Sequence, residues 1–286
     1  MNSWLPQRQE VVRAALLGCL TLGSVACSPP AKSASEVWTA DAKPLAVQLD
    51  RAQLATPGFR WVELPADAGS GKVHRFVLGV PESSEALGPR PFVVFLHGGG
   101  GSRGLLEKLE CLVTPAFATV SPIVVAPEGG RGEWWHAEET SFVLGLTAAA
   151  ARDWPIQTER VVIMGYSNGG IGAWFFARLY PERFSAAIPM ASNHTIIGES
   201  PLPVFAIHGS QDDMFDVSSV RENITSLAGR GFDVQLLVKP RGRHGKPCDY
   251  VPELQAAVEW LEADVWQRPP PAEPSPQAEP PAAPGG

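Results

Sequence analysis

Short apolar runs alternate with longer segments of helical pattern through the middle of this chain. Six of the runs are rich in valine and isoleucine, and continuous apolar runs of this length are typical of strands buried on both faces of a sheet. These runs cover residues 91–98, 121–129, 160–167, 185–192, 203–210 and 233–240. Two earlier strand-like runs, 58–64 and 73–81, predict a hairpin at the start of the sheet.

The segments between these runs predict helices. The helix candidates cover residues 105–112, 138–154, 170–179, 217–229 and 251–266. In the last candidate, apolar residues recur at the spacing of one helix face, at Leu254, Val258, Leu261 and Val265. Strands and helices that alternate in this way predict an α/β fold, with a mostly parallel twisted sheet and helices on both faces.

The N-terminus has the pattern of an export signal. Arg8 and Arg13 precede an apolar stretch, 14–26. This stretch is shorter than the roughly 20 residues that span a bilayer and suits the apolar region of a signal peptide. The segment SVAC, which ends at Cys27, resembles a bacterial lipoprotein signal. We therefore expect cleavage of residues 1–26, acylation of Cys27 and anchoring at the cell envelope; free secretion and an uncleaved anchor stay open.

Composition divides the remaining chain into three parts. Residues 27–50 are rich in Pro, Ala, Ser and Lys and predict a flexible tether. Residues 268–286 are proline-rich and predict a disordered tail, with a proline-rich ligand segment as the alternative. Residues 51–267 are long enough for one α/β domain, given 44% hydrophobic residues overall. The formal charge of −7 and the lack of a basic cluster argue against nucleic acid as a partner.

Ser167 stands between Gly165 and Gly169, after one apolar run and before a helix candidate. This Gly-x-Ser-x-Gly spacing in a strand–turn–helix setting is typical of a nucleophile elbow. A sharp turn forces the serine into an uncommon backbone conformation, so its neighbours must be small. A plain strand-to-helix turn is the alternative interpretation.

A serine hydroxyl needs a base to remove its proton, usually a histidine oriented by a carboxylate. His244 lies in a loop-like stretch after the last apolar run. Asp212 and Asp213 follow the run before it, with Asp216 close behind. The order Ser167, Asp212, His244 is the chain order of a serine–acid–histidine triad in a sheet enzyme.

These motifs together resemble the serine esterases of the α/β-hydrolase family, closest to the lid-poor carboxylesterase and polyhydroxybutyrate-depolymerase-like groups. The resemblance covers roughly Phe92 to Trp260 and rests on HGGGG, GYSNGG, HGSQDDMFDV and RGRHG in that order. It implies that residues 51–267 form a catalytic domain without a large cap. It also implies that Asp212 is the acid, ahead of Asp213 and Asp216, and that His244 is the base.

The resemblance assigns an oxyanion hole to backbone N–H groups of Gly99, with Gly98 next in line, and of Asn168, which follows the serine. Two fixed donors at such a site stabilise the charge that develops on the acyl oxygen. A merely flexible glycine loop is the alternative for the first two residues.

The remaining candidates lie around this centre. Trp134, Trp135, His136 and His194 are candidate pocket residues, although the tryptophans could instead pack under their loop. His97 and His208 each precede a glycine at the end of a strand candidate, and we expect them to brace loops. No ligand set at metal spacing and no dinucleotide fingerprint is present in the sequence, so we expect no metal and no cofactor.

Two further cysteines, Cys111 and Cys248, can pair in an oxidising compartment. Two separate buried thiols are the alternative. A bond between them would tie the first helix to the loop that carries His244.

The resemblance implies a serine hydrolase that cleaves carboxylic esters through an acyl-enzyme. A serine peptidase of the same fold and a non-catalytic surface binding module are the alternatives. A binding module predicts a broken triad, whereas all three residue types are present here. The sequence leaves open both the oligomeric state and the ester, which could be small or linked to a polysaccharide or polyester.

Overall fold

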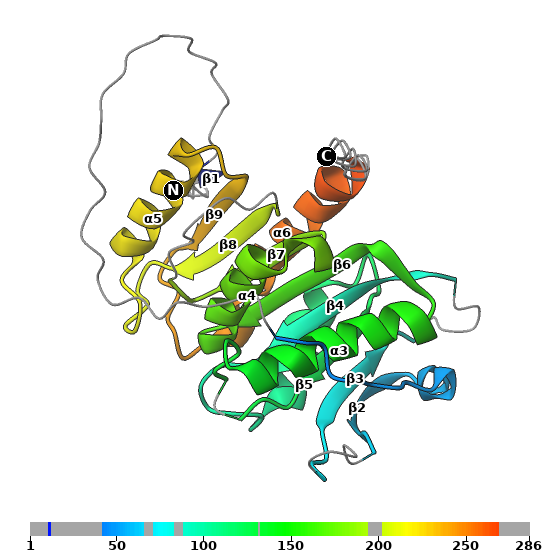
Figure 1. Cartoon of the computed structure of the whole chain (residues 1–286). Coiled ribbons are helices and arrows are strands. Elements are labelled where there is room, and N and C mark those ends of the chain that lie inside the picture. Colours follow the sequence, from blue (N-terminus) through cyan, green and yellow to red (C-terminus); the bar gives the residue numbers. More distant parts are fainter. Residues whose placement is uncertain are drawn as a thin grey trace, which may run out of the picture.

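A single twisted sheet forms the centre of the molecule in a computed structural model (Figure 1). The structure describes residues 11–12, 42–65, 71–82, 88–130, 132–193 and 202–268. The order of strands across it is β1-β9-β8-β7-β6-β4-β5-β3-β2. The strands are β1 (Val11–Val12), β2 (Gly58–Glu63), β3 (Arg75–Val80), β4 (Arg90–Leu96), β5 (Ile123–Pro127), β6 (Ile156–Tyr166), β7 (Ala186–Met190), β8 (Val204–Gly209) and β9 (Val234–Lys239). Each of the eight predicted runs overlaps one of these strands, and β4 and β6 begin before their predicted runs, at Arg90 and Ile156.

Most strand pairs are parallel. β4 pairs in parallel with β5 and β6, and the parallel pairing continues from β6 through β7 and β8 to β9. The early hairpin β2–β3 is antiparallel and joins the sheet by an antiparallel pairing of β3 with β5. The carboxyl ends of the parallel strands therefore meet at one edge of the sheet, where the loops after them can combine their side chains.

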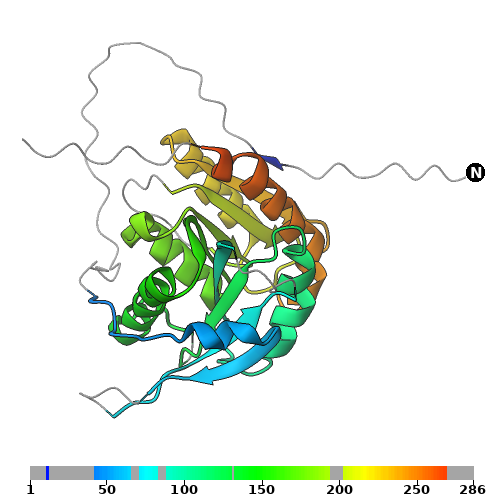
Figure 2. The same cartoon turned by 90° about the vertical axis from the view of Figure 1, so that its right-hand side faces the viewer.

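Helices cover both faces of the sheet, as the alternating pattern predicts (Figure 2). The main helical segments are α1 (Leu105–Lys108), the π-helical turn η3 (Leu109–Val113), α2 (Thr114–Ala116), α3 (Ala137–Asp153), α4 (Asn168–Leu179), α5 (Val217–Gly229) and α6 (Val251–Ala263). Shorter 3₁₀ segments are η1 (Arg51–Ala55), η4 (Pro181–Arg183), η5 (Pro247–Tyr250) and η6 (Val265–Gln267). The predicted α/β fold with helices on both faces is confirmed.

Two hydrophobic cores lie on opposite faces of the sheet because side chains alternate along each strand. In β4, Phe92 and Val94 point into the core shared with α3, α4 and α5. Their neighbours Val93 and Phe95 point into the core shared with α1, α2 and α6. Burial on both faces explains why these strands are continuous apolar runs in the sequence.

The folded part begins earlier than predicted. Residues 42–50, assigned from composition to a flexible tether, run along α3: the N–H of Leu45 donates to the carbonyl of Ser141, and the N–H of Leu49 donates to Asp153. Val47 is buried in the core. The prediction of a flexible tether over 27–50 is therefore wrong for its last nine residues, 42–50. Apolar side chains along this segment pack against α3, a helix distant in the sequence.

Other predictions about the ends lie almost wholly outside the described residues. These are Cys27, the predicted tail of 268–286 beyond its first residue Arg268, and most of the segment assigned to a signal peptide. The exception is β1, whose two residues pair antiparallel with Leu237 and Leu236 of β9. Among the described ranges, no helix is both long and apolar enough to cross a membrane.

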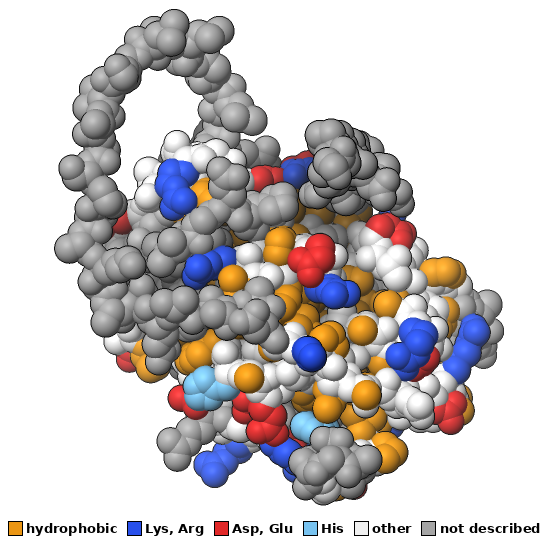
Figure 3. All heavy atoms as spheres, viewed as in Figure 1, with side chains coloured by type: hydrophobic (Ala, Val, Ile, Leu, Met, Phe, Trp, Pro, Cys, Tyr) orange, Lys and Arg blue, Asp and Glu red, His pale blue; other side chains and the backbone are white. Residues whose placement is uncertain are grey.

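Basic and acidic side chains are interspersed on the face of the molecule in Figure 3, wherever described residues are coloured. The described part of this face thus has no continuous basic surface of the kind that binds a nucleic acid backbone.

Candidate active site

Ser167 lies at the tight turn between β6 and α4. Its φ of 58° is in the left-handed region, which a non-glycine residue adopts at a cost. Gly169 has no room for a side chain, because an added Cβ would lie 1.9 Å from the carbonyl oxygen of Leu96. An added Cβ on Gly165 would lie 2.3 Å from the carbonyl oxygen of Gly169. Both glycines of the motif are therefore required by close backbone approach, as expected for a nucleophile elbow.

Three side chains from three strand ends form one hydrogen-bonded chain. The hydroxyl of Ser167, after β6, lies 2.9 Å from Nε2 of His244, which follows β9. Nδ1 of the same imidazole lies 2.9 Å from Oδ2 and 3.1 Å from Oδ1 of Asp212, which follows β8. The Asp212 side chain is 0% exposed and that of His244 is 11% exposed. The order hydroxyl, imidazole, carboxylate is the geometry in which a histidine can accept a serine proton.

The structure distinguishes the three candidate acids. Asp212 Oδ1 accepts the N–H groups of Met214 and Phe215, which fixes the carboxylate while Oδ2 faces His244. Asp213 is exposed. Asp216 caps α5, where its side chain accepts the N–H of Ser219. Only Asp212 contacts the imidazole among these three.

Two tyrosines that sequence reasoning missed hold the loop of His244. The hydroxyl of Tyr166 donates to the carbonyl of His244 at 2.7 Å, and that of Tyr250 donates to the carbonyl of Arg243 at 3.3 Å. Burial raises the pKa of both phenols well above the ordinary value, so both stay protonated donors. The one sequence feature that could have pointed to either tyrosine is that Tyr166 directly precedes Ser167.

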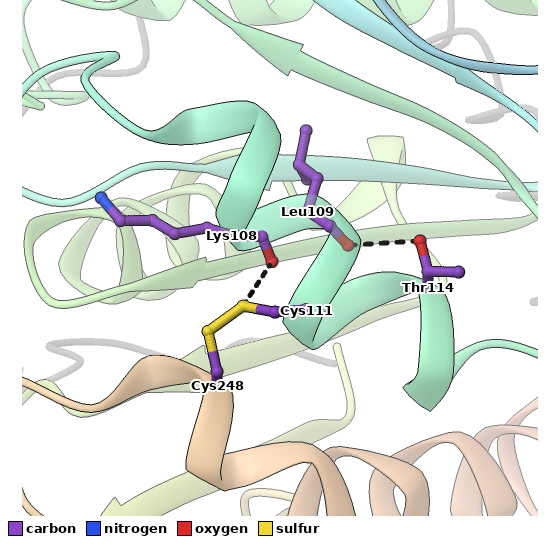
Figure 4. Close-up of a disulfide and its surroundings, with 5 residues drawn as sticks. All are labelled: Lys108, Leu109, Cys111, Thr114 and Cys248. Carbon is purple, nitrogen blue, oxygen red and sulfur yellow. Dashed lines mark hydrogen bonds between the residues drawn. A yellow bond between two sulfur atoms is a disulfide. The ribbon is translucent and has the colours of Figure 1, made fainter.

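A disulfide joins Cys111 of η3 to Cys248 of η5, with their Cα atoms 5.4 Å apart (Figure 4). The bond connects segments 137 residues apart in sequence. Because η5 also contains Tyr250, the bond anchors the segment that supports the loop of His244.

Removing this bond is expected to lower stability and activity together. A Cys111→Ser, Cys248→Ser double variant should lose about 2–5 kcal/mol of unfolding free energy, since a bond closing so long a loop restricts the unfolded chain. We expect kcat for an ester to fall about threefold or more as the His244 loop becomes more mobile. A threefold fall corresponds to a rise of roughly 0.7 kcal/mol in activation free energy. Chemical denaturation and steady-state kinetics measure both, with the oxidised wild type as reference. An unchanged unfolding midpoint with full activity would contradict this role.

The glycine loop after β4 lies beside the serine. A Cβ added to Gly98 would be 3.2 Å from Cβ of Ser167, whereas Gly99 is exposed further along the loop. Asn168 is the first residue of α4, so its N–H has no partner within the helix. The helix dipole also favours negative charge at this end. The oxyanion assignment to Gly98, Gly99 and Asn168 stays a prediction.

His97 supports the glycine loop after β4. Its ring is buried, with Nδ1 2.8 Å from the carbonyl of Gly98 and Nε2 close to the backbone of Gly129. Burial lowers the pKa of His97, which keeps the imidazole neutral near pH 7. The ring connects the loop after β4 with the loop after β5.

The prediction that Trp134 lines a pocket is wrong. Trp134 is 0% exposed, and its indole N–H donates to the carbonyl of His97 at 3.0 Å. The ring packs on Gly129 and Gly172, where an added Cβ would overlap it. A large apolar ring with one donor is thus used to support the glycine loop.

The other pocket candidates stay predictions. Trp135 is half-buried against the core, and its ring meets that of His136 edge-on. His136 is exposed, 3.8 Å from the carboxylate of Glu133. His194 lies outside the described residues. Within the described ranges, no group of three or more His, Cys, Asp or Glu side chains is placed to hold a metal ion.

Comparison with known proteins agrees with the fold. Residues 134–269, just under half of the chain, match the model of the dienelactone hydrolase family. The chain is 28% identical over 106 residues to a bifunctional acetylxylan esterase/xylanase of Neocallimastix patriciarum, covering 34% of this chain and 16% of that protein. It is 28% identical over 117 residues to a pimeloyl-[acyl-carrier protein] methyl ester esterase of Vibrio campbellii, covering 41% and 43%.

The crystal structure of a thermostable esterase superposes with a TM-score of 0.55 at 25% identity, over 71% of this chain and 62% of that one. The chain thus spans less than two thirds of the length of each of these relatives. The parallel sheet, the elbow after β6 and these similarities together show that the chain has an α/β-hydrolase fold.

Proposed function

We propose that this chain is a serine hydrolase that cleaves carboxylic esters. The observation that carries the proposal is the hydrogen-bonded series Ser167–His244–Asp212, with the serine at a left-handed elbow. The similarity to three esterases supports the same reaction class. A non-catalytic binding module has no need for a strained serine aligned with a base.

In the proposed reaction, Oγ of Ser167 attacks the acyl carbon while its proton passes to Nε2 of His244. Asp212 holds Nδ1–H, which fixes the tautomer and stabilises the imidazolium. The carbonyl oxygen becomes an oxyanion, for which the N–H groups of Gly98 or Gly99 and Asn168 are the proposed donors. His244 then protonates the leaving alcohol, and the acyl group remains on Ser167.

The second half of the reaction uses the same residues with water in place of the alcohol. His244 takes a proton from water, the resulting hydroxide attacks the acyl-enzyme, and the proton returns to Ser167 as the acid leaves. The three side chains, the proposed backbone N–H donors and water account for every bond that forms and breaks in this scheme.

A matched pair of chromogenic substrates tests this proposal against the peptidase alternative. The purified protein should hydrolyse p-nitrophenyl acetate far faster than an acyl p-nitroanilide of the same acyl group. A series of longer acyl esters and acetylated xylan then defines the class of ester. Preference for the anilide would favour the peptidase, and a lack of turnover on both by folded protein would favour the binding module.

We also propose that the chain is exported and anchored through acylated Cys27. The support is the sequence pattern alone, with its charged start, short apolar stretch and SVAC segment. Intact mass and palmitate labelling of the protein from a bacterial host test this, with Cys27→Ala as the control. A mature protein that carries an unmodified Cys27 would exclude the anchor.

A further inference from the structure

His208 is a buried histidine that the proposed mechanism does not use. It lies in β8, four residues before Asp212, and is 0% exposed. Burying an imidazole is unfavourable unless its nitrogens find partners. Nε2 lies 2.9 Å from the carbonyl oxygen of Phe215, while Nδ1 is buried with no hydrogen-bond partner. An apolar side chain here would avoid the cost of burying a ring nitrogen without a partner, so the polar ring needs a specific explanation.

The contacts determine the tautomer of His208. A carbonyl oxygen only accepts, so Nε2 must carry the hydrogen and donate it to Phe215. A hydrogen on Nδ1 would then have no acceptor. Burial lowers the pKa of His208 against the opposing effects of the Phe215 carbonyl and the Asp212 and Asp216 carboxylates, and His244 lowers it further. The ring is accordingly a neutral Nε2–H donor.

Phe215 connects this donor to the catalytic carboxylate. Its N–H donates to Asp212 Oδ1 at 2.9 Å, its carbonyl accepts from His208, and its ring lies 5.6 Å from that of His244 between centroids. The Nε2 atom of His208 is itself 3.8 Å from Asp212 Oδ2, on a carboxylate that also faces His244. The turn after β8 is therefore held at its far end by a buried histidine.

We propose that His208 is a positioning residue for Asp212: its Nε2–H holds the Phe215 carbonyl, so that the turn presents the carboxylate to His244. This inference rests on the proposed function, because it assigns His208 a part in the same triad. Loss of the donor lets the turn relax, and Asp212 then spends less time aligned with Nδ1 of His244. The effect should appear in kcat, since the His208 side chain is fully buried and is not exposed to a bound ester.

The test compares variants that keep or remove the donor. His208→Met removes it while filling the space with an unbranched apolar chain, and His208→Gln places an amide N–H the same number of bonds from the backbone. We expect kcat for p-nitrophenyl acetate to fall about tenfold in H208M, the size of one lost hydrogen bond. KM should change less than about twofold, and H208Q should recover most of the rate.

A double-mutant cycle separates positioning from a general structural role. In an Asp212→Ala background, H208M should cause no further loss of kcat, because its effect passes through the missing carboxylate. Thermal unfolding of each variant reports on folding. If H208M does not fold, His208→Asn replaces it, because its shorter amide does not reach the Phe215 carbonyl.

Wild-type rates in H208M, or in folded H208N, would overturn the inference, as would an equal loss with and without Asp212. Failure of H208Q to recover activity while it folds normally would also overturn it. A wild-type protein that hydrolyses no ester is a different result: it removes the proposed function, and this inference with it.

Discussion

Replacing Ser167 with alanine is expected to lower kcat for an activated ester by about four to six orders of magnitude, which is the range seen when the nucleophile of a serine triad is removed. The reason is the loss of the oxygen that forms the acyl-enzyme, since Oγ is the atom 2.9 Å from His244 Nε2. Folding should be little affected, because alanine at this elbow keeps the backbone and removes a single atom. Steady-state hydrolysis of p-nitrophenyl acetate measures the change.

Ser226→Ala on the exposed surface of α5 is the matched control for that variant, and it should retain the wild-type rate. Background hydrolysis by contaminants sets the lower limit, so both proteins must be prepared identically. If Ser167→Ala keeps more than about a tenth of the activity, the activation free energy has risen by less than about 1.4 kcal/mol. Such a result would mean that another group performs the attack.

The second large effect is expected for Asp212→Asn, with a loss of about four orders of magnitude in kcat. An amide N–H₂ facing Nδ1 favours the tautomer with hydrogen on Nε2, which then cannot accept the serine proton. The buried Asp212 side chain accepts the N–H groups of Met214 and Phe215 through Oδ1, and the asparagine oxygen can replace that acceptor. The variant should therefore fold.

The chain offers a matched control one residue away. Asp213→Asn removes the same charge from an exposed neighbour and should leave kcat within about a factor of two of the wild-type value. This corresponds to a change of under about 0.5 kcal/mol in activation free energy. Comparable losses in the two variants would point to a general electrostatic effect of the loop. A larger loss in Asp213→Asn would mean that the acid is wrongly assigned.

Local pattern predicted the main strands and helices because each shows its own apolar pattern, whereas the short strand β1 and the first residues of β6 were not predicted. The six buried strands are mostly apolar since both their faces meet helices, and the candidate at 251–266 covers α6 and the first two residues of η6. The resemblance and chain order were enough to name Ser167, Asp212 and His244, which follow three strands whose carboxyl ends meet at one edge of the sheet.

Features that depend on distant packing were not predictable. Trp134 was expected in a pocket, but its indole N–H finds the carbonyl of His97, 37 residues away. Residues 42–50 were assigned to a tether because composition does not reveal that α3 offers them a surface. The support that Tyr250 gives to the His244 loop and the burial of His208 beside Asp212 likewise arise only when the strands come together.

Activation of Ser167 is tested most directly by fluorophosphonate labelling of the purified protein, followed by intact mass and peptide mapping, with Ser167→Ala in parallel. A fluorophosphonate reacts with a serine whose proton is removed by a neighbouring base, so labelling reports on activation independently of the ester chosen. If Ser167 is the activated nucleophile, we expect one label, on Ser167, that is absent from the variant. A folded wild-type protein that takes up no label, or equal labelling of Ser167→Ala, would contradict this assignment.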